Sequence, residues 1–227
     1  MLFSATLMER AMPGKINRRK FFFLTGAGLA ALAVQSRLSA GGNQALKGGT
    51  ARVDITPPVG CWLSGWASRD RPSEGVSDSL YAKAVVLSSG QTEIAIVAAD
   101  LIGIPAEIVA EVRKAVEQKT GIAQDNIMIS ASHTHFGPAT GKYRFKNWKV
   151  DPDYIEVLKE KLAAVVVMAH SGLTSVRVGS AKGKAPELLY NRRTKRPDGK
   201  VVMTFALPPA EPDLSFGPVD PEVGVLR

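Results

Sequence analysis

The sequence predicts an α/β fold: a mixed sheet with crossover helices that forms the N-terminal part of a larger domain and follows an export signal. Short apolar strands rich in β-branched residues alternate with two longer segments of helical periodicity. One of these helical segments lies between two strands, which indicates a crossover connection. The printed chain stops partway into an apolar strand over residues 219–227, which indicates that the domain continues.

Residues 1–40 have the features of a twin-arginine export signal. Arg18 and Arg19 stand just before an apolar stretch from Phe21 to Val34, and small residues near Ala40 suit a cleavage site. The stretch of about 14 residues is short for a bilayer core of about 30 Å, so a membrane anchor is the weaker interpretation. We therefore expect an exported protein that is periplasmic or secreted.

The leader is followed by a linker over residues 41–49 and a folded domain over residues 50–227. The formal net charge is +8, and much of it comes from the leader. The densest basic run of the domain, residues 192–196, has no interleaved aromatic residues, so we expect no nucleic-acid binding. Cys61 is the only cysteine, which excludes an intrachain disulfide and a cysteine metal cluster.

Three strands are predicted in the first half of the domain. The first covers residues 50–56 and ends at Pro57-Pro58, because proline cannot donate to a ladder. Residues 80–88 and 93–101 form a hairpin around the turn at 89–91. The second hairpin strand is apolar on both faces, so it should lie inside the sheet.

Two loops are candidate contact surfaces. The loop over residues 59–77 contains Trp62 and Trp66, which suit either the rim of a cleft or a cover for the core. The loop over residues 142–149 mixes aromatic and basic side chains. That mixture suits an anionic or amphiphilic substrate or a peripheral membrane contact, and a merely solvated loop is the alternative.

Two helices are predicted. The first runs from Pro105 through Lys119, with Gly121 just past its end. The second begins at Asp151-Pro152 and continues through residue 169, and His170 at its C-terminal end is assigned a structural role. Beyond it we expect a strand over 174–180, a hairpin over 190–204 and a proline-rich loop over 207–218.

The candidate site follows the strand that begins at Ile127. His133 and His135 are two residues apart, so in an extended chain both imidazoles project to one side, with Cα atoms about 6.6 Å apart. Two neutral imidazoles so placed can both hold a metal ion, or one can hold it while the other handles a proton or a developing negative charge. A His-x-His pair is also common in polar loops, but the exit of a buried strand is a typical position for a site.

Asp100 stands at the end of the preceding apolar strand. A carboxylate in this position either forms a turn or orients a nearby histidine through a hydrogen bond. Both interpretations remain open for Asp100.

Six motifs, in this order, are similar to the N-terminal domain of the neutral/alkaline non-lysosomal ceramidases. The resemblance covers residues 50–227, and Phe136 stands where the family commonly has serine. The motifs are residues 50–57, 80–84, 99–101, Ser132–Pro138, Asn191–Arg193 and 219–223.

The resemblance implies a zinc amidase that cleaves the amide of N-acyl sphingoid bases, small amphiphilic substrates. It implies that His133 is a zinc ligand and that His135 is a catalytic group that positions substrate or stabilises the oxyanion. Arg192 would help to hold the site or meet substrate, or would be a buried structural arginine. The family's remaining zinc ligands, a later histidine, a glutamate and a tyrosine, and its catalytic serine lie in a region that the printed sequence does not contain.

Two alternatives follow from this interpretation. The chain would be a non-catalytic or vestigial binding module if the downstream ligands are truly missing, because a catalytic zinc site takes three protein ligands and a water. The fold and metal could also serve a non-lipid amide or ester.

Overall fold

The computed structural model describes residues 45–141 and 149–227, apart from 206, 208, 210 and 212. Its fold is mixed α/β, as predicted, and the main element is a five-stranded sheet. In spatial order the strands are β4 (Ile127–Ala131), β3 (Thr92–Ala99), β2 (Tyr81–Ser89), β1 (Lys47–Asp54) and β5 (Thr174–Ser175). The expected leader and most of the aromatic and basic loop lie outside the described residues.

The pairing of the strands confirms a mixed sheet. Strands β1, β2 and β3 pair antiparallel, and β3 pairs with β4 in parallel. The helix α2 (Ala106–Thr120) and the short 3-10 helix η1 (Gln124–Asn126) make the crossover between these two parallel strands. Strand β3 has a neighbour on each side, which agrees with its apolar composition.

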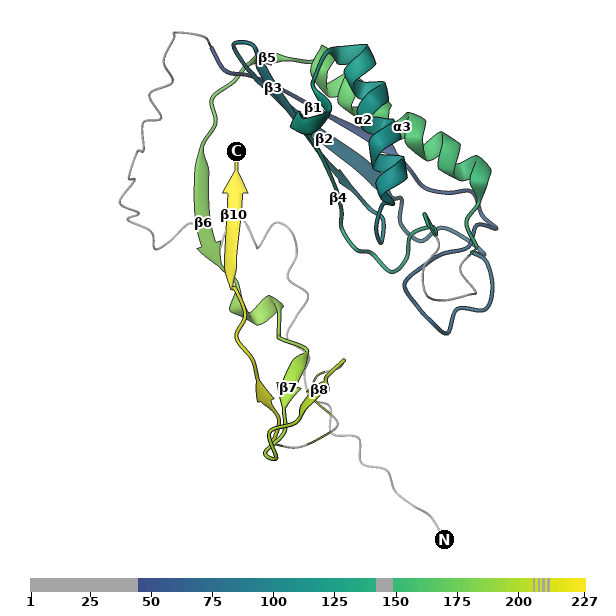
Figure 1. The fold of residues 1–227 in the computed structure, drawn as a ribbon, viewed down its shortest axis with the longest axis vertical. Helices are drawn as coiled ribbons and strands as arrows, with labels where there is room; N and C mark the ends of the chain where they lie inside the picture. Colours follow the sequence, from purple (N-terminus) through teal and green to yellow (C-terminus); the bar gives the residue numbers. More distant parts are fainter. Residues whose placement is uncertain (1–44, 142–148, 206, 208, 210, 212) are drawn as a thin grey trace, which may run out of the picture. The chain divides into compact units, whose positions relative to one another are not determined.

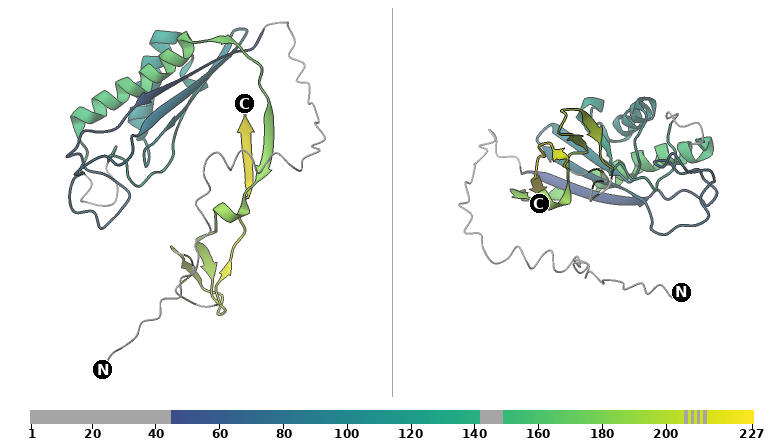
Figure 2. Two further views of the ribbon diagram at one scale, coloured as in Figure 1. Left: turned by 180° about the vertical axis from the view of Figure 1, so that it is seen from behind. Right: turned by 90° about the horizontal axis from the view of Figure 1, so that it is seen from below.

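The two helices cover the same face of the sheet, as Figures 1 and 2 show. The second helix, α3 (Pro152–Ser171), begins where the Asp151 side chain accepts a hydrogen bond from the Tyr154 N–H at 3.1 Å. Helix α2 ends at Gly121, whose φ of 80° requires the left-handed region. Both helix ends are therefore those that the sequence predicts.

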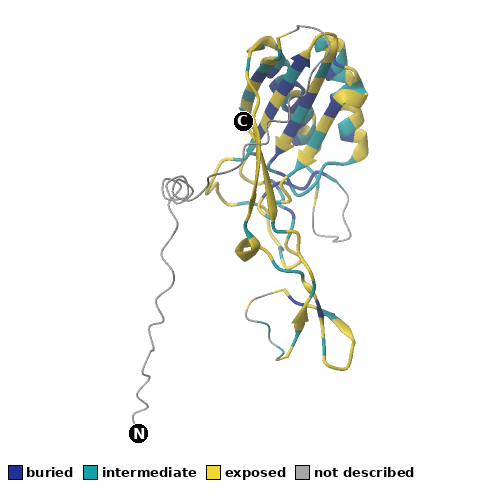
Figure 3. Ribbon diagram, turned by 90° about the vertical axis from the view of Figure 1, so that its left-hand side faces the viewer, coloured by how far each residue is buried: buried dark blue, intermediate teal, exposed yellow. Residues whose placement is uncertain are grey.

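The hydrophobic core is made by buried residues of the sheet and of both helices, and Figure 3 shows buried residues as dark blue segments of the ribbon. Gly49 is needed in β1, because an added Cβ would stand 1.9 Å from the Ala169 carbonyl oxygen of α3. The buried Tyr154 hydroxyl donates to the Ile55 carbonyl at 2.5 Å, so this polar group is satisfied inside the core. The largest fully buried side chains are those of Ile55, Val86, Val97, Leu101, Val112, Val116, Ile122, Ile127, Leu158, Leu162, Val165 and Val166.

The remaining strands form two small sheets. One pairs β6 (Ser180–Lys184) with β10 (Glu222–Leu226), and the other contains β7 (Arg193–Lys195), β8 (Val201–Met203) and β9 (Ser215–Phe216), with η2 (Pro186–Leu188) between β6 and β7. The predicted hairpin over 190–204 and the final strand are confirmed. The single strand predicted over 174–180 is wrong, because residues 174–175 pair with β1 whereas Ser180 pairs with Leu226.

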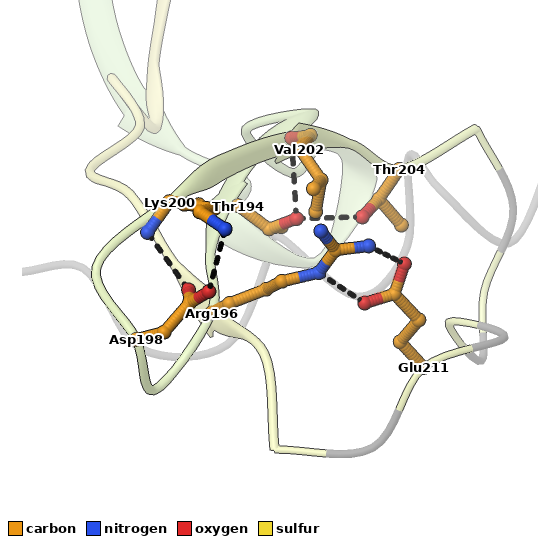
Figure 4. Close-up of polar contacts among 7 residues, drawn as sticks. All are labelled: Thr194, Arg196, Asp198, Lys200, Val202, Thr204 and Glu211. Atoms are coloured by element: carbon orange, nitrogen blue, oxygen red, sulfur yellow. Dashed lines mark hydrogen bonds and ion pairs between the residues drawn. The ribbon is translucent and has the colours of Figure 1, made fainter.

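Polar contacts hold the hairpin of β7 and β8 together (Figure 4). The hydroxyls of Thr194 and Thr204 are buried and lie 2.7 Å apart. Arg196 donates two hydrogen bonds to the Glu211 carboxylate, at 2.6 and 2.5 Å. This bidentate pair raises the pKa of Arg196 and lowers that of Glu211 from their usual values, mainly through the hydrogen bonds between them.

Neither helix of the described part of the chain has both the length and the apolar character that a bilayer crossing requires.

Candidate active site

Residues 132–138, here called the histidine segment, form a loop. Strand β4 ends at Ala131, and His133 has a φ of 60°, a conformation that residues other than glycine rarely adopt. The extended geometry predicted for His133 and His135 is therefore wrong. The two rings are neighbours all the same, with their centroids 5.1 Å apart and their planes at 69°.

The orientation of the His133 ring is set by a backbone carbonyl. The Nδ1–H donates to the Ile102 carbonyl oxygen at 2.8 Å. A carbonyl oxygen only accepts, so in the neutral ring this contact places the proton on Nδ1 and leaves the Nε2 lone pair available. This arrangement is typical of histidines that bind metals through Nε2, and His133 is exposed.

The loop of residues 59–77 positions His135. The Trp66 ring meets the His135 ring edge to face at 5.6 Å, and Arg69 Nη2 donates to the His135 carbonyl at 3.3 Å. Gly65 has a φ of 106°, and an added Cβ would lie 2.4 Å from His135 Cβ. A side chain at position 65 would therefore displace His135.

Main-chain hydrogen bonds join this loop to the end of the histidine segment. The Ser64 N–H donates to the Gly137 carbonyl at 2.9 Å, and the Ala139 N–H donates to the Trp62 carbonyl at 2.9 Å. The buried Ser64 hydroxyl lies 3.2 Å from the Pro138 carbonyl and adds a further hydrogen bond. These contacts order both loops together.

The two tryptophans of the loop have different surroundings. Trp66 is half exposed beside His135, so it suits the rim of a site. Trp62 is partly buried, and its ring lies 5.1 Å from the ammonium group of Lys149.

Arg69 is the residue beside the histidines that no sequence pattern indicated. Its guanidinium carbon lies 6.0 Å from the centre of the Phe136 ring, and burial lowers the pKa of Arg69 from its ordinary value. The Nε atom is buried and has no hydrogen-bond partner among the described residues. The histidine segment is therefore flanked by a cation that no described carboxylate neutralises.

The structure places Asp100 just past the end of β3, where the antiparallel pairing of β2 and β3 ends. Its carboxylate accepts the Tyr81 N–H at 3.0 Å, and its own N–H donates to the Tyr81 carbonyl at 2.9 Å. These contacts match the turn-forming interpretation. The hydrogen bond that orients the His133 ring comes from the Ile102 carbonyl. That Asp100 also orients a histidine stays a prediction.

Arg192 lies in the hairpin region that contains β7. Its guanidinium lies 5.6 Å from the Phe205 ring, and its carbonyl accepts the Thr204 N–H at 2.8 Å. The side chain is exposed, so the buried alternative is wrong. A contact between Arg192 and substrate stays a prediction.

The residues present fit a metal site in part. His133, with Nε2 available, suits a zinc ligand, and His135 stands beside it. Within residues 45–141 and 149–227, less the four positions excepted above, no group of three or more His, Cys, Asp or Glu side chains could hold a metal ion. This part of the chain therefore supplies at most two imidazoles to such a site.

Comparison with known proteins agrees with this fold. Neutral ceramidase from Pseudomonas aeruginosa superposes with a TM-score of 0.59 and 18% identity, over 82% of this chain and 29% of that chain. A structure described as ceramidase complexed with C2 gives a TM-score of 0.55 and 18% identity, over 68% of this chain and 25% of that one.

The chain thus spans less than a third of the length of either solved relative. At this identity the two structures show a shared fold. The family model of the neutral/alkaline non-lysosomal ceramidase N-terminal domain matches residues 47–195, more than half of the chain. The chain belongs to the neutral/alkaline non-lysosomal ceramidase family.

Proposed function

We propose that the chain supplies part of the active site of an exported, zinc-dependent amidohydrolase that cleaves the amide of an N-acyl sphingoid base or a related N-acyl lipid. The observation that carries the proposal is the pair of adjacent imidazoles, one of which has its Nδ1 proton held by a backbone carbonyl. Family membership supports the reaction class.

His133 is the zinc ligand of this proposal. The Ile102 carbonyl fixes the tautomer that leaves Nε2 free, which is the arrangement found around metal-bound histidines. When bound, zinc lowers the pKa of a coordinated water to about 7 and polarises the carbonyl of the amide. Further protein ligands are needed to complete a catalytic site, and the proposal assigns them to residues outside the described ones.

His135 is the second catalytic residue of the proposal. Its ring is close enough to that of His133 for both rings to contact the same small chemical group of a substrate. A ring N–H held in place can donate to the amide oxygen as negative charge develops there, and a donor that is already positioned costs no reorganisation. Trp66, Gly65 and Arg69 maintain that position through the contacts described above.

A non-catalytic binding module is the second candidate. It is favoured by the shortage of metal ligands within the described ranges. Such a module would bind an N-acyl compound and leave it intact, whereas the amidohydrolase would release the free amine. A non-lipid amide substrate would appear as hydrolysis of short, polar N-acyl compounds in preference to long apolar ones.

The test is a zinc measurement combined with an amidase assay. The full-length protein that contains this chain is purified, supplied with zinc and assayed on a panel of fluorogenic N-acyl substrates, beside the same protein carrying His133→Asn. Asparagine tolerates the positive φ at this position, so the backbone can be kept while the ligand is lost. We expect the variant to lose zinc and at least about a hundredfold of its hydrolysis rate.

The matched control is His170→Asn. His170 contacts Glu93 at 3.1 Å and belongs to the end of α3, so its loss should leave zinc content and hydrolysis unchanged. The proposal would be rejected if the unaltered full-length protein held no zinc and the His133→Asn variant hydrolysed the panel as fast as the unaltered protein. Binding of N-acyl compounds without any hydrolysis would favour the binding module.

Export is a separate part of the proposal, and it depends on Arg18 and Arg19. Replacing both with lysine keeps the charge and removes the paired guanidinium groups that a twin-arginine signal requires. We expect this double variant to stay in the cytoplasm while the unaltered chain is exported. Equal export of the two forms would remove this part of the proposal.

A further inference from the structure

A cavity of about 480 Å³ lies against the histidine segment and is here called the Phe136 cavity. Its lining includes Thr134, which stands between the two histidines, and Phe136, whose side chain is 65% exposed. The volume falls within the usual range for small-molecule sites. A ligand in this cavity would therefore contact the segment that carries the two imidazoles.

The walls of the Phe136 cavity combine apolar surface with one negative charge. Pro57, Leu63, Leu80 and Phe136 supply apolar lining. Asp78 supplies the carboxylate, which accepts a hydrogen bond from the Ser77 hydroxyl at 3.2 Å. The lining contains no lysine, arginine or histidine, so nothing in the wall offsets this charge.

The guanidinium of Arg69, which contacts the histidine segment, does not line this cavity. Arg69 contacts the His135 carbonyl and lines a separate hollow of about 560 Å³ together with Trp66. The lining of that hollow also contains Asp70, Arg71 and Glu74, so its positive and negative charges balance. The Phe136 cavity differs, because Asp78 is the one charged residue of its lining. Hydrolysis of an amide gives a carboxylate and an amine, and an uncompensated carboxylate favours the amine.

We propose that the Phe136 cavity binds the amine half of the substrate, an apolar chain with an ammonium or hydroxyl group near Asp78. This inference rests on the function proposed above. In amide hydrolysis the water oxygen bonds to the acyl carbon, the C–N bond breaks and the nitrogen takes up a proton. The amine is then a cation at neutral pH, and Asp78 is the group of the cavity that attracts it.

The test is a binding experiment that requires no hydrolysis. Octylammonium and octanoate have the same apolar chain and opposite charges, and each is titrated calorimetrically into the full chain near neutral pH and at low salt. The formal net charge of +8 favours the anion overall, so a preference for the cation must have a local origin. We expect octylammonium to bind about tenfold more tightly than octanoate.

Two substitutions in the cavity locate that preference. Asp78→Asn should bring the two affinities to within about twofold of each other, because it removes the charge and keeps the shape. Phe136→Ser, which introduces the residue common in the family, should weaken both ligands about threefold or more through lost apolar contact. Asp70→Asn is the matched control, since this exposed carboxylate lines only the separate hollow.

The proposal is overturned if octanoate binds as tightly as octylammonium, or if Asp70→Asn removes the preference as fully as Asp78→Asn. Failure of the proposed function gives a different result. A chain that hydrolyses no amide and still prefers octylammonium through Asp78 keeps the cavity assignment and loses the catalytic one. A chain that hydrolyses amides and shows no such preference keeps the catalytic assignment and loses the cavity assignment.

Discussion

The helix-covered sheet and the segment of residues 180–227 are held together by different forces. Every residue of the hydrophobic core cluster lies between Ile55 and Ala169. In residues 180–227 the buried side chains are those of Thr194 and Thr204, both polar, among the positions the structure describes. Figure 3 shows the same contrast, with buried stripes on the five-stranded sheet and exposed surface along β6 and β10.

Because of this difference, the stability of the two regions should depend on different kinds of substitution. Burial of apolar area stabilises the sheet and its helices, and loss of a core side chain should weaken them as a unit. The second segment exposes large apolar side chains, among them Leu188, Phe205 and Leu226, and relies on strand pairing and polar contacts. Its stability should therefore be local and sensitive to single hydrogen bonds.

The largest expected effect is in the core. Leu158→Ala in α3 removes a fully buried side chain and should lower the free energy of unfolding by about 3 kcal/mol, through lost burial and a residual cavity. Urea unfolding followed by circular dichroism measures it. The neighbouring Val157→Ala, on the exposed side of the same helix, should change it by less than about 0.5 kcal/mol. Equal effects of the two substitutions would contradict the assignment of the core.

The next effect concerns the loop that contacts His135. Gly65→Ala imposes a strained φ and a clash with His135, and it should cost about 2 to 3 kcal/mol and shift the imidazole NMR signals. Gly60→Ala imposes a similar φ with no atom within 4 Å of the new Cβ, so it should cost about 1 kcal/mol and leave those signals in place. Similar spectra for the two variants would show that Gly65 does not position the histidine.

A smaller and local effect is expected in the β7 and β8 hairpin. Thr194→Val leaves the buried Thr204 hydroxyl without its partner and should weaken the hairpin by about 1 kcal/mol. Amide hydrogen exchange in these two strands should become about fivefold to tenfold faster, with the urea midpoint of the core unchanged. Thr174→Val, at an exposed position in β5, is the control. A fall in the midpoint of the core would show that the two regions unfold together.

The smallest effect is at alkaline pH. Cys61 is buried in the first region, its thiol donates to the Asp151 carboxylate at 3.2 Å, and burial above all raises its pKa from 9.0 to about 11. The unfolded thiol ionises first as the pH rises, so the folded state loses stability between pH 9.0 and about 11. The loss should be on the order of 1 kcal/mol after solvent screening.

Urea unfolding of Cys61→Ala over the same pH range checks this prediction. The variant should lack the part of the alkaline decline that comes from Cys61, so the difference in stability between the two forms should narrow from pH 9 upward. A constant difference across the range would show that the thiol has an ordinary pKa in the folded chain.

Local sequence patterns were enough to predict most of the first region. The hairpin of β2 and β3, the helix ends at Asp151 and Gly121, and the parallel β4 all follow from turn, capping and crossover rules that act over a few residues. The break after Ser175 could not be predicted in this way. It depends on a pairing between Ser180 and Leu226, which are far apart in the chain.

The candidate site was predicted by residue type and not by geometry. The Ser-His-Thr-His pattern contains no glycine or asparagine to indicate a positive φ, yet His133 adopts one. The Ile102 carbonyl and Arg69 meet the histidines only after folding brings three separate loops together. Gly65, between Ser64 and Trp66, is the one local sign of close backbone approach that could have been found in the sequence.

The hydrogen bonds that join residues 62–69 to the histidine segment have a practical consequence. Ser64, Gly65, Trp66 and Arg69 all lie outside the hydrophobic core cluster. The exposed Trp66 ring and the Arg69 side chain can therefore be varied in search of altered selectivity with little loss of apolar burial. Gly65 and the buried Ser64 must be kept, because the course of the loop depends on them.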